Sequence, residues 1–249
     1  MSAKLVIIPT YNEKENIEAI TRKVFSLGTR FDVLVIDDGS PDGTAGIVKR
    51  LQNEFRDRLY LVERTGKQGL GTAYIAGFRW GLAHGYEQVC EMDADFSHNP
   101  DDLVRLSAAC DEGADIAVGS RYITGVNVVN WPMKRVMMSY YGSAYVRKIL
   151  RLKIRDMTAG FKCYTRRVLE AIDFDRVRMK GYGFQIEMKY TAIKLGFSLV
   201  EVPIIFVDRK LGSTKMSGGI FREALWGVIM LKLRKIRRKS LGEVSPQSA

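Results

Sequence analysis

Residues 33–43 read VLVIDDGSPDG, an apolar run of strand type that ends in two aspartates and is followed by a Ser-Pro pair typical of a helix start. Similar short apolar runs occur at residues 5–8, 59–62, 88–92 and 116–118. Longer helical patterns lie between them, and this alternation indicates βαβ units. The sequence therefore predicts an α/β fold with one mostly parallel, twisted sheet flanked by helices.

Cap residues predict where the helices begin. Asn12 and Glu15 have the spacing of a capping box, while Ser40 and Asn99 each stand directly before a proline, a preferred first residue of a helix. The predicted N-terminal helices cover residues 13–27, 41–55, 71–83 and 100–112. Further helical patterns occur at residues 133–152 and 182–195, and a strand is predicted at residues 198–206.

Composition limits the classes of function. Of the 249 residues, 39 are Lys or Arg and 28 are Asp or Glu, so the net charge is 39 − 28 = +11, and six of the basic residues lie within residues 232–239. This charge favours anionic partners: nucleic acid, phosphorylated small molecules or an acidic membrane surface. The three cysteines and two histidines are widely spaced, which argues against a disulfide framework or a Cys/His zinc site.

No segment has the pattern of a membrane-spanning helix. The longest stretch without a charged side chain, residues 122–133, has 12 residues, whereas a spanning helix needs about 20. The apolar run at residues 5–8 is too short for a secretory signal. We therefore expect the protein to face the cytoplasm.

Acidic side chains stand where two of the predicted strands end. Asp37 and Asp38 end the second strand, and ligands bind outside the carboxyl ends of strands in open α/β sheets, so these residues suit ribose hydroxyls and base N–H groups. Asp93 and Asp95 follow the fourth strand. In an extended segment they point the same way and can share one cation. Carboxylate oxygens suit Mg²⁺ or Mn²⁺, which fill their other positions with water and phosphate.

Basic residues near the predicted strand ends are candidates for phosphate binding. Arg121 follows the fifth strand, and Arg135 lies further along the chain. Arg209 and Lys215 flank a Gly-Ser pair, which indicates a loop that could close over an anion. The glycine-rich residues 66–71 match neither a Walker loop nor a dinucleotide fingerprint, and they predict a tight turn.

Five motifs, taken in order, resemble one known family. They are Pro9-Thr10-Tyr11-Asn12-Glu13, the segment 35–44, Met92-Asp93-Ala94-Asp95, Gly119-Ser120-Arg121-Tyr122 and Phe206-Val207-Asp208-Arg209. Over about residues 4–220 they resemble the dolichyl-phosphate (polyprenyl-phosphate) mannose synthases, which are inverting family-2 glycosyltransferases. The resemblance implies a Rossmann-like GT-A domain, here residues 1–215.

The resemblance also implies roles for individual residues. The donor nucleoside would be held by Pro9, Tyr11, Glu13, Ile36 and Asp38. The ribose, the metal and the diphosphate would be held by Asp93, Ala94 and Asp95, with Ser97, where some relatives have Gln, as a third metal ligand. Phosphates of the nucleotide sugar would bind Arg209 and Lys215, and the acceptor phosphate would bind Arg121 and Arg135. The implied catalytic set is Asp95, Arg121, Arg209 and Lys215.

The reaction implied is transfer of mannose from GDP-mannose to a polyprenyl (dolichyl) phosphate, with Mg²⁺ or Mn²⁺ as cofactor and inversion at the anomeric carbon. The acceptor is a phosphate monoester whose second pKa is about 6, so it is largely dianionic at neutral pH and needs no strong base. The sequence accordingly offers no catalytic histidine, and we assign His84 and His98 to packing or caps.

Two alternatives stay open. A sibling glycosyltransferase would use UDP-glucose or a saccharide acceptor, and a saccharide hydroxyl requires a base, for which Asp156 and Glu187 are the candidates. A nucleic-acid-binding module would explain the net charge of +11. It would leave the acidic strand ends unexplained, because carboxylates repel a phosphate backbone. We therefore expect no nucleic-acid partner.

The C-terminal part predicts contact with an anionic membrane surface. Residues 216–249 are expected to form an amphipathic helix with Trp226 near the headgroups, followed by the basic tail. Residues 133–152, rich in Tyr, Met and basic side chains, are a rival membrane contact. The resemblance allows for a membrane-anchoring subunit as a further partner. We expect a peripheral location on the cytoplasmic face of the membrane.

Overall fold

The structure is a computed structural model that describes residues 3–179, 181–208 and 218–239, with the backbone alone for residues 218–225. Its main sheet has the strand order β3-β2-β1-β4-β7-β5-β8. The strands are β1 (Lys4–Thr10), β2 (Asp32–Asp37), β3 (Leu59–Glu63), β4 (Gln88–Glu91), β5 (Ile116–Ser120), β7 (Lys162–Thr165) and β8 (Leu199–Pro203). Neighbours are parallel except β7, which is antiparallel to both β4 and β5. The predicted mostly parallel sheet is confirmed, and β7 is a strand that the sequence pattern missed.

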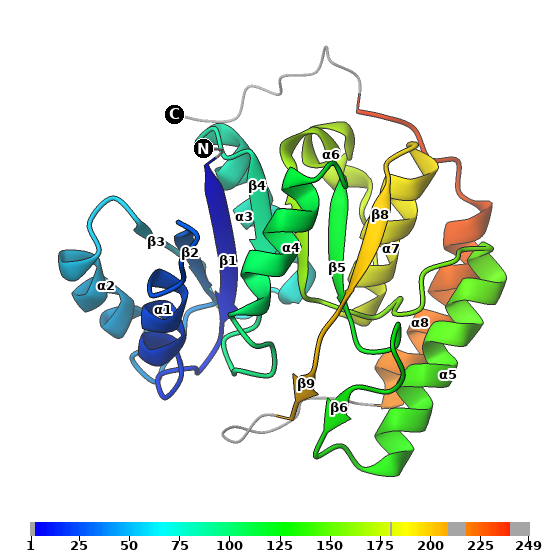
Figure 1. Ribbon diagram of the computed structural model, residues 1–249, viewed down its shortest axis with the longest axis horizontal. Helices are drawn as coiled ribbons and strands as arrows, with labels where there is room; N and C mark the ends of the chain where they lie inside the picture. Colours follow the sequence, from blue (N-terminus) through cyan, green and yellow to red (C-terminus); the bar gives the residue numbers. More distant parts are fainter. Residues whose placement is uncertain (1–2, 180, 209–217, 240–249) are drawn as a thin grey trace.

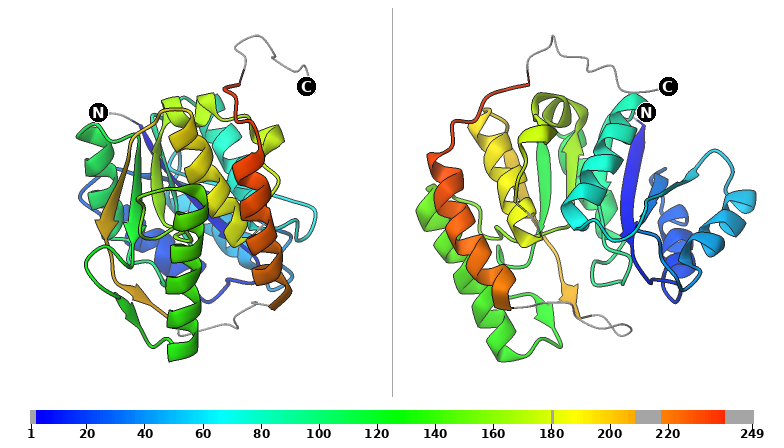
Figure 2. Two further views of the ribbon diagram at one scale, coloured as in Figure 1. Left: turned by 90° about the vertical axis from the view of Figure 1, so that its right-hand side faces the viewer. Right: turned by 180° about the vertical axis from the view of Figure 1, so that it is seen from behind.

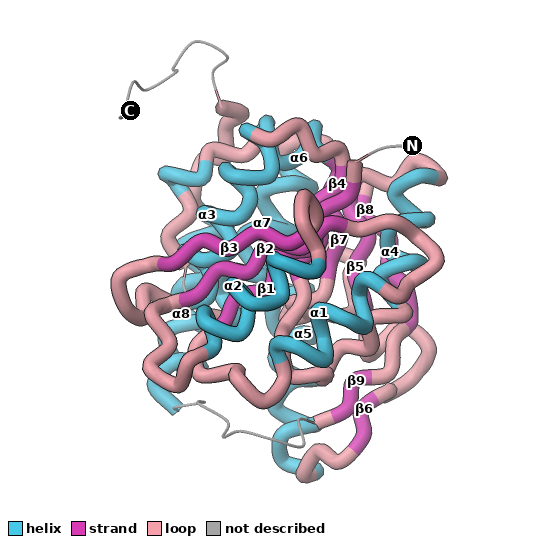
Figure 3. The backbone as a smooth tube through the Cα atoms, turned by 90° about the vertical axis from the view of Figure 1, so that its left-hand side faces the viewer, coloured by secondary structure: helices cyan, strands magenta, loops and turns pink. Residues whose placement is uncertain are grey.

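Helices cover both faces of the sheet (Figures 1 and 2). Side chains alternate along β1, so Ile8 faces one helical layer and Ile7 faces the other. The first layer contains α1 (Ile17–Phe25), α2 (Thr44–Glu54) and α4 (Asp102–Asp111). The second contains α3 (Leu70–Ala83), α6 (Arg166–Ala171), the short 3-10 helix η1 (Phe174–Arg176) and α7 (Tyr182–Lys194). Figure 3 shows the resulting order of helix, sheet and helix.

Two glycines let α3 approach its neighbours closely. A Cβ atom at Gly77 would lie 2.6 Å from Ile7 Cδ1, and one at Gly71 would lie 2.9 Å from the ring of Phe184 on α7. Glycine is unfavourable inside an isolated helix, but here its lack of a side chain is what allows α3 to pack. The helix predicted at residues 71–83 is confirmed.

The C-terminal part forms a third packing region. α5 (Met133–Leu150) and α8 (Gly218–Leu233) lie side by side next to α7 (Figure 2). The core between these helices contains Val146, Leu150, Ile186, Tyr190, Val228 and Leu231. A small parallel sheet of β6 (Val128–Val129) and β9 (Phe206–Val207) lies below the main sheet in Figure 1. α8 therefore packs on the same body that carries the main sheet.

Three predicted helix starts are wrong. α1, α2 and α4 begin at residues 17, 44 and 102 instead of 13, 41 and 100. Ser40 Oγ donates to Asp37 Oδ1 and accepts from Asn12 N, so it joins two strand ends instead of capping a helix. Asn12 has a φ of 61° and starts no helix, and Gly43, with a φ of 91°, directly precedes α2. The residues between the predicted and the observed helix starts belong to the loops at the carboxyl edge of the sheet.

Candidate active site

The carboxyl ends of β1, β2 and β4 meet at one edge of the sheet, the lower edge in Figure 1. In the parallel register, Thr10 lies opposite Asp37, and Ile7 lies opposite Glu91. The residues predicted to hold the nucleoside lie at or just after the carboxyl ends of β1 and β2, and the Asp93–Asp95 pair follows β4. The structure therefore brings these two predicted groups to the same edge, where open α/β sheets bind ligands.

Asp37 has a structural role. Its side chain is 1% exposed and accepts hydrogen bonds from Thr10 Oγ1 at 2.8 Å and from Ser40 N at 2.9 Å. Ser40 Oγ donates to the same carboxylate at 2.6 Å. The carboxylate of Asp37 therefore stabilises the turn after β2, and of the two adjacent aspartates Asp38 is the candidate for ligand binding.

Asp38 is held by an arginine that the sequence did not single out. Arg64 Nε donates to Asp38 Oδ1 at 2.6 Å, and Gln68 N donates to Oδ2 at 3.3 Å. Arg64 Nη1 also donates to Thr72 Oγ1 at 2.9 Å. Arg64 thus connects Asp38 with the start of α3 and with the turn predicted at residues 66–71. No local pattern marks Arg64, because its partner is 26 residues away.

The other residues predicted for the nucleoside differ in what they expose. The side chain of Ile36 is fully buried in the core, so only its backbone can contact a ligand. Glu13 N donates to Thr44 Oγ1, and a carboxylate oxygen of Glu13 accepts from Asn16. Lys67 Nζ lies 5.1 Å above the ring of Tyr11. Pro9 lies near the carboxyl end of β1, and Ala94 lies shortly after β4.

The Asp93–Asp95 pair is held by side chains and backbone on several sides. Tyr74 Oη donates to Asp93 Oδ1 at 3.3 Å. The buried ring of His98 stacks on Phe161, and its Nδ1 accepts from Asp93 N at 3.4 Å. Burial lowers the pKa of His98, although Asp93 and Asp95 oppose this shift. His98 therefore packs as predicted, but it also contacts the acidic pair.

The oxygen donors of the acidic pair are of the type that Mg²⁺ and Mn²⁺ take. Carboxylate oxygens are the ligands these ions prefer, and Mg²⁺ commonly uses one or two carboxylates together with water and phosphate oxygens. Across residues 3–179, 181–208 and 218–239, no group of three His, Cys, Asp or Glu side chains is placed to hold an ion. Ser97, the predicted third ligand, is 2% exposed; its N–H donates to Asp95 Oδ1, and its carbonyl accepts from Val207 N.

Arg121 lies in a buried ion pair. Its Nε and Nη2 donate to the two carboxylate oxygens of Asp156 at 2.6 and 2.7 Å, and Nη2 also donates to Thr158 Oγ1. Burial alone would raise the pKa of Asp156, but the attraction of Arg121 outweighs it, and the pKa is lowered. Within the part of the chain that the structure describes, Arg121 Nη1 makes no hydrogen bond, in contrast to Nε and Nη2.

Arg135 lies close to Arg121 through a shared aromatic ring. The guanidinium carbon of Arg135 is 4.0 Å from the ring centre of Trp131, and that of Arg121 is 5.4 Å from it. Arg135 Nη1 also forms an ion pair with Asp208 at 2.9 Å. The structure thus brings together the two arginines predicted for the acceptor phosphate. Arg209 and Lys215 lie outside the described residues.

A buried polar network lies next to the acidic pair. Gln185 Nε2 of α7 donates to Glu91 Oε2 at 2.8 Å, and Lys162 Nζ of β7 lies 3.2 Å from the same oxygen. Lys189 Nζ donates to the carbonyl of Ala159 at 2.8 Å. Burial lowers the pKa of both lysines. Sequence patterns did not indicate this network, because only the position of β7 between β4 and β5 brings its members together.

Neither candidate base for a saccharide acceptor is presented to a substrate. Asp156 and Glu187 are both fully buried. Asp156 is paired with Arg121, while Glu187 accepts hydrogen bonds from the backbone N–H groups of Arg178 and Met179 and pairs with Arg234. These two carboxylates therefore stabilise the fold.

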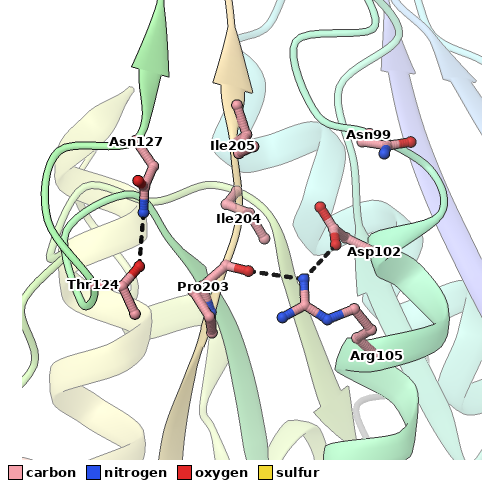
Figure 4. Close-up of a pocket in the computed structure, with 8 residues that line it drawn as sticks. All are labelled: Asn99, Asp102, Arg105, Thr124, Asn127, Pro203, Ile204 and Ile205. Atoms are coloured by element: carbon pink, nitrogen blue, oxygen red, sulfur yellow. Dashed lines mark hydrogen bonds and ion pairs between the residues drawn. The ribbon is translucent and has the colours of Figure 1, made fainter.

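A cavity of about 380 Å³ lies between the start of α4 and the segments that follow β5 and β8, and residues 93–97 do not line it (Figure 4). Arg105 of α4 crosses one side, where it donates to Asp102 Oδ1 and to the carbonyl of Pro203. The wall is completed by Asn99, Thr124, Asn127, Ile204 and Ile205. None of the predicted ligand-binding residues lines this cavity.

The exposed surfaces of α5 and α8 carry large apolar side chains. Met133, Met137 and Tyr141 are exposed on α5, and Trp226, Met230 and Leu233 are exposed on α8. In the basic tail, Arg234 and Arg238 bond to the body of the protein, whereas Lys232, Lys235 and Arg237 are exposed. Among the helices that the structure describes, none combines the length and apolar character needed to span a membrane.

The acidic side chains at the carboxyl edge of this sheet lie where open α/β sheets bind their ligands. The chain belongs to glycosyl transferase family 2, whose model matches residues 5–173. Over 229 residues it is 50% identical to the polyprenol monophosphomannose synthase of Mycolicibacterium smegmatis, covering 90% of this chain and 86% of that protein. It is 48% identical to the undecaprenyl-phosphate mannosyltransferase of Micrococcus luteus, covering 90% of this chain and 93% of that protein.

Solved structures agree on the fold. Glucosyl-3-phosphoglycerate synthase from Mycobacterium tuberculosis, in complex with Mn²⁺, UDP and glucosyl-3-phosphoglycerate, superimposes with a TM-score of 0.68 at 18% identity, covering 92% of this chain and 80% of that chain. The same enzyme with Mn²⁺, UDP and phosphoglyceric acid gives a TM-score of 0.69 at 16% identity, covering 93% of this chain and 78% of that chain. The resemblance stated from the motifs and the GT-A-like fold are confirmed.

Proposed function

We propose that the protein transfers mannose from GDP-mannose to a polyprenyl phosphate and forms polyprenyl-phosphate mannose. The observation that carries the proposal is the placement of Asp93 and Asp95 at the same sheet edge as Asp38, in a chain about half identical to two enzymes named for this type of reaction. The identity of the base and the use of GDP rest on the motif resemblance.

The donor would lie across the edge formed by β1, β2 and β4. Asp38, held by Arg64, would accept hydrogen bonds from the N–H groups of the base. Pro9, Tyr11, Glu13, Ile36 and Ala94 would line the nucleoside site. Asp93 and Asp95, with Ser97 beside them, would hold the divalent ion and through it the diphosphate. When bound, this ion would act as a Lewis acid that stabilises negative charge on the leaving GDP.

The acceptor phosphate would be oriented by Arg121 and Arg135. Arg121 would use its remaining Nη1, while Asp156 keeps the rest of the guanidinium in place. An oxygen of the acceptor phosphate attacks the anomeric carbon and forms the new C–O bond. The bond to the GDP oxygen breaks on the opposite face, its electron pair leaves with GDP, and the configuration inverts. Arg209 and Lys215 would add positive charge over the leaving diphosphate.

A polyprenyl acceptor places the reaction at a lipid surface. We expect residues 1–215 to carry the catalytic site and residues 216–249 to contact an anionic membrane, as a peripheral protein on the cytoplasmic face. The exposed apolar side chains of α8 and the neighbouring cations support this expectation. The exposed apolar side chains of α5 offer a second membrane contact. A separate anchoring subunit would be compatible with either surface.

A donor and acceptor screen tests the function. The purified protein is given GDP-mannose or UDP-glucose with a polyprenyl phosphate in detergent, and both the released nucleoside diphosphate and the lipid product are measured. We expect product from GDP-mannose with polyprenyl phosphate and none with the Asp95→Asn variant. Turnover of UDP-glucose, or transfer to a free saccharide, would favour the sibling glycosyltransferase. Salt-sensitive binding of random duplex DNA without turnover would favour the nucleic-acid module.

A further inference from the structure

The Asp93 carboxylate has a buried hydrogen-bond donor on its protein side. Tyr74 Oη lies 3.3 Å from Asp93 Oδ1 and donates to it. The side chain of Asp93 is 38% exposed, whereas Tyr74 is 0% exposed. The contact therefore joins an interior residue of α3 to a carboxylate at the open edge of the sheet.

Packing fixes the position of the Tyr74 ring. The ring lies parallel to Phe184 of α7, with an interplanar angle of 6° and a centroid distance of 6.2 Å, and it stacks against Phe78 at 6.3 Å. Gly71, on the preceding turn of α3, leaves space for Phe184 that a Cβ atom would fill. The Tyr74 Oη atom cannot move away from Asp93 unless the ring leaves this core.

We propose that Tyr74 is a positioning residue of the metal and diphosphate site. Its hydroxyl holds Asp93 Oδ1 and so orients the carboxylate toward the ion that Asp93 and Asp95 share. The inference rests on the proposed function, in which these two aspartates bind a divalent cation. Hydrogen bonds that orient a metal ligand commonly change metal affinity by about 10- to 100-fold when they are removed.

Tyr164 of β7 provides a matched control. It is also 0% exposed, lies in the same hydrophobic cluster and contacts Phe78 edge to face. Among the described residues its hydroxyl has no partner at normal hydrogen-bond geometry, and the carboxylate that acts on it is Glu91 rather than Asp93. Tyr164→Phe therefore removes a buried hydroxyl from the same core without touching Asp93, while Tyr74→Phe removes the one that orients it.

The test measures direct binding of Mn²⁺ to the full-length protein saturated with GDP. The electron paramagnetic resonance signal of free Mn²⁺ reports how much of the ion stays unbound. We expect Tyr74→Phe to raise the dissociation constant for Mn²⁺ about 10-fold, and Tyr164→Phe to leave it unchanged. Binding of GDP in the presence of EDTA should be equal in all three proteins. Excess Mn²⁺ should restore turnover of Tyr74→Phe.

Three outcomes would overturn the inference. If Tyr74→Phe binds Mn²⁺ like the unsubstituted protein while Asp95→Asn does not, the positioning role is wrong and the proposed metal site stands. If Tyr164→Phe weakens binding equally, general loosening of the core explains the effect and the role of the Tyr74 hydroxyl is wrong. If the unsubstituted protein with GDP binds no Mn²⁺, the proposed metal site fails, and the inference fails with it.

Discussion

Arg121 and Asp156, 35 residues apart in the sequence, form a two-pronged ion pair inside the protein, next to the proposed acceptor site. The carboxylate uses both oxygens on one guanidinium, and both side chains are buried. The pair fixes Arg121 in one orientation. It also makes Asp156 unsuitable as a base, because the ion pair lowers its pKa.

Removing the charge of Asp156 should strongly destabilise the protein. Asp156→Asn leaves a buried guanidinium without its counter-ion, and breaking such a pair costs about 3–5 kcal/mol. The control is Asp208→Asn, which affects the partly exposed pair with Arg135 and should cost about 1 kcal/mol or less. Urea unfolding measures both. Similar losses for the two variants would contradict the assignment.

The same pair predicts how stability depends on pH. The folded-state pKa of Asp156 lies below its usual value of 3.8. The contribution of the pair is therefore complete above that value and is lost as the pH falls through the folded-state pKa. We expect the difference in unfolding free energy between the unsubstituted protein and Asp156→Asn to be constant near neutral pH and to narrow below about pH 4. A difference that stays constant down to pH 2 would argue against this origin.

Asp95→Asn should abolish turnover without unfolding the protein. The substitution removes one negative charge from the proposed ion site and changes the shape of the side chain little. Turnover is measured with Mg²⁺ and with Mn²⁺, and circular dichroism checks the fold. Near-normal activity with either ion would exclude Asp95 as a ligand.

Arg64→Ala should weaken GDP binding, because Asp38 would lose the donor that orients it. Hydrogen bonds to charged groups are worth about 1.5–3 kcal/mol, so a rise of roughly tenfold or more in the GDP dissociation constant is expected. Arg79→Ala is the control on the neighbouring helix α3, since Arg79 forms an exposed pair with Asp175. Equal GDP affinity in both variants would remove Arg64 from the donor site.

Arg209→Ala and Lys215→Ala should lower turnover more than they weaken binding of free GDP. This split is expected if their segment closes over the leaving group only when both substrates are bound. Steady-state kinetics and calorimetry with GDP separate the two effects. If neither variant changes turnover, these residues are ordinary surface charges.

Charge removal from the tail should reduce membrane binding. The triple variant Lys232→Gln, Lys235→Gln, Arg237→Gln removes exposed cations, each worth about 1 kcal/mol near an anionic leaflet. Truncation after Leu231 is a poorer test, because it also removes the bond from Arg234 to Glu187. For the triple variant we expect less sedimentation with anionic liposomes than for the unsubstituted protein, and unchanged GDP binding. Unchanged sedimentation would move the contact to α5.

Local features account for what could be predicted well. The alternation of strands and helices follows from short apolar runs and helical patterns, and the acidic strand ends are visible because each aspartate directly follows its strand. The predictions of three helix starts were wrong because the residues concerned make contacts with distant parts of the chain. Ser40 has the sequence signature of a cap, but in the fold it joins Asp37 to Asn12, which is 28 residues away.

The sequence by itself determined the α/β class, the family and the meeting of Asp38, Asp93 and Asp95 at one edge, because parallel strands carry their carboxyl ends to the same side. Only the tertiary structure decided what those groups contact. Tyr74 reaches Asp93 across 19 residues, and Gln185 reaches Glu91 across 94. The packing of α3, β7 and α7 around a shared core determines these partners. The fully buried Glu91 must find its partner within that core, because water cannot supply one.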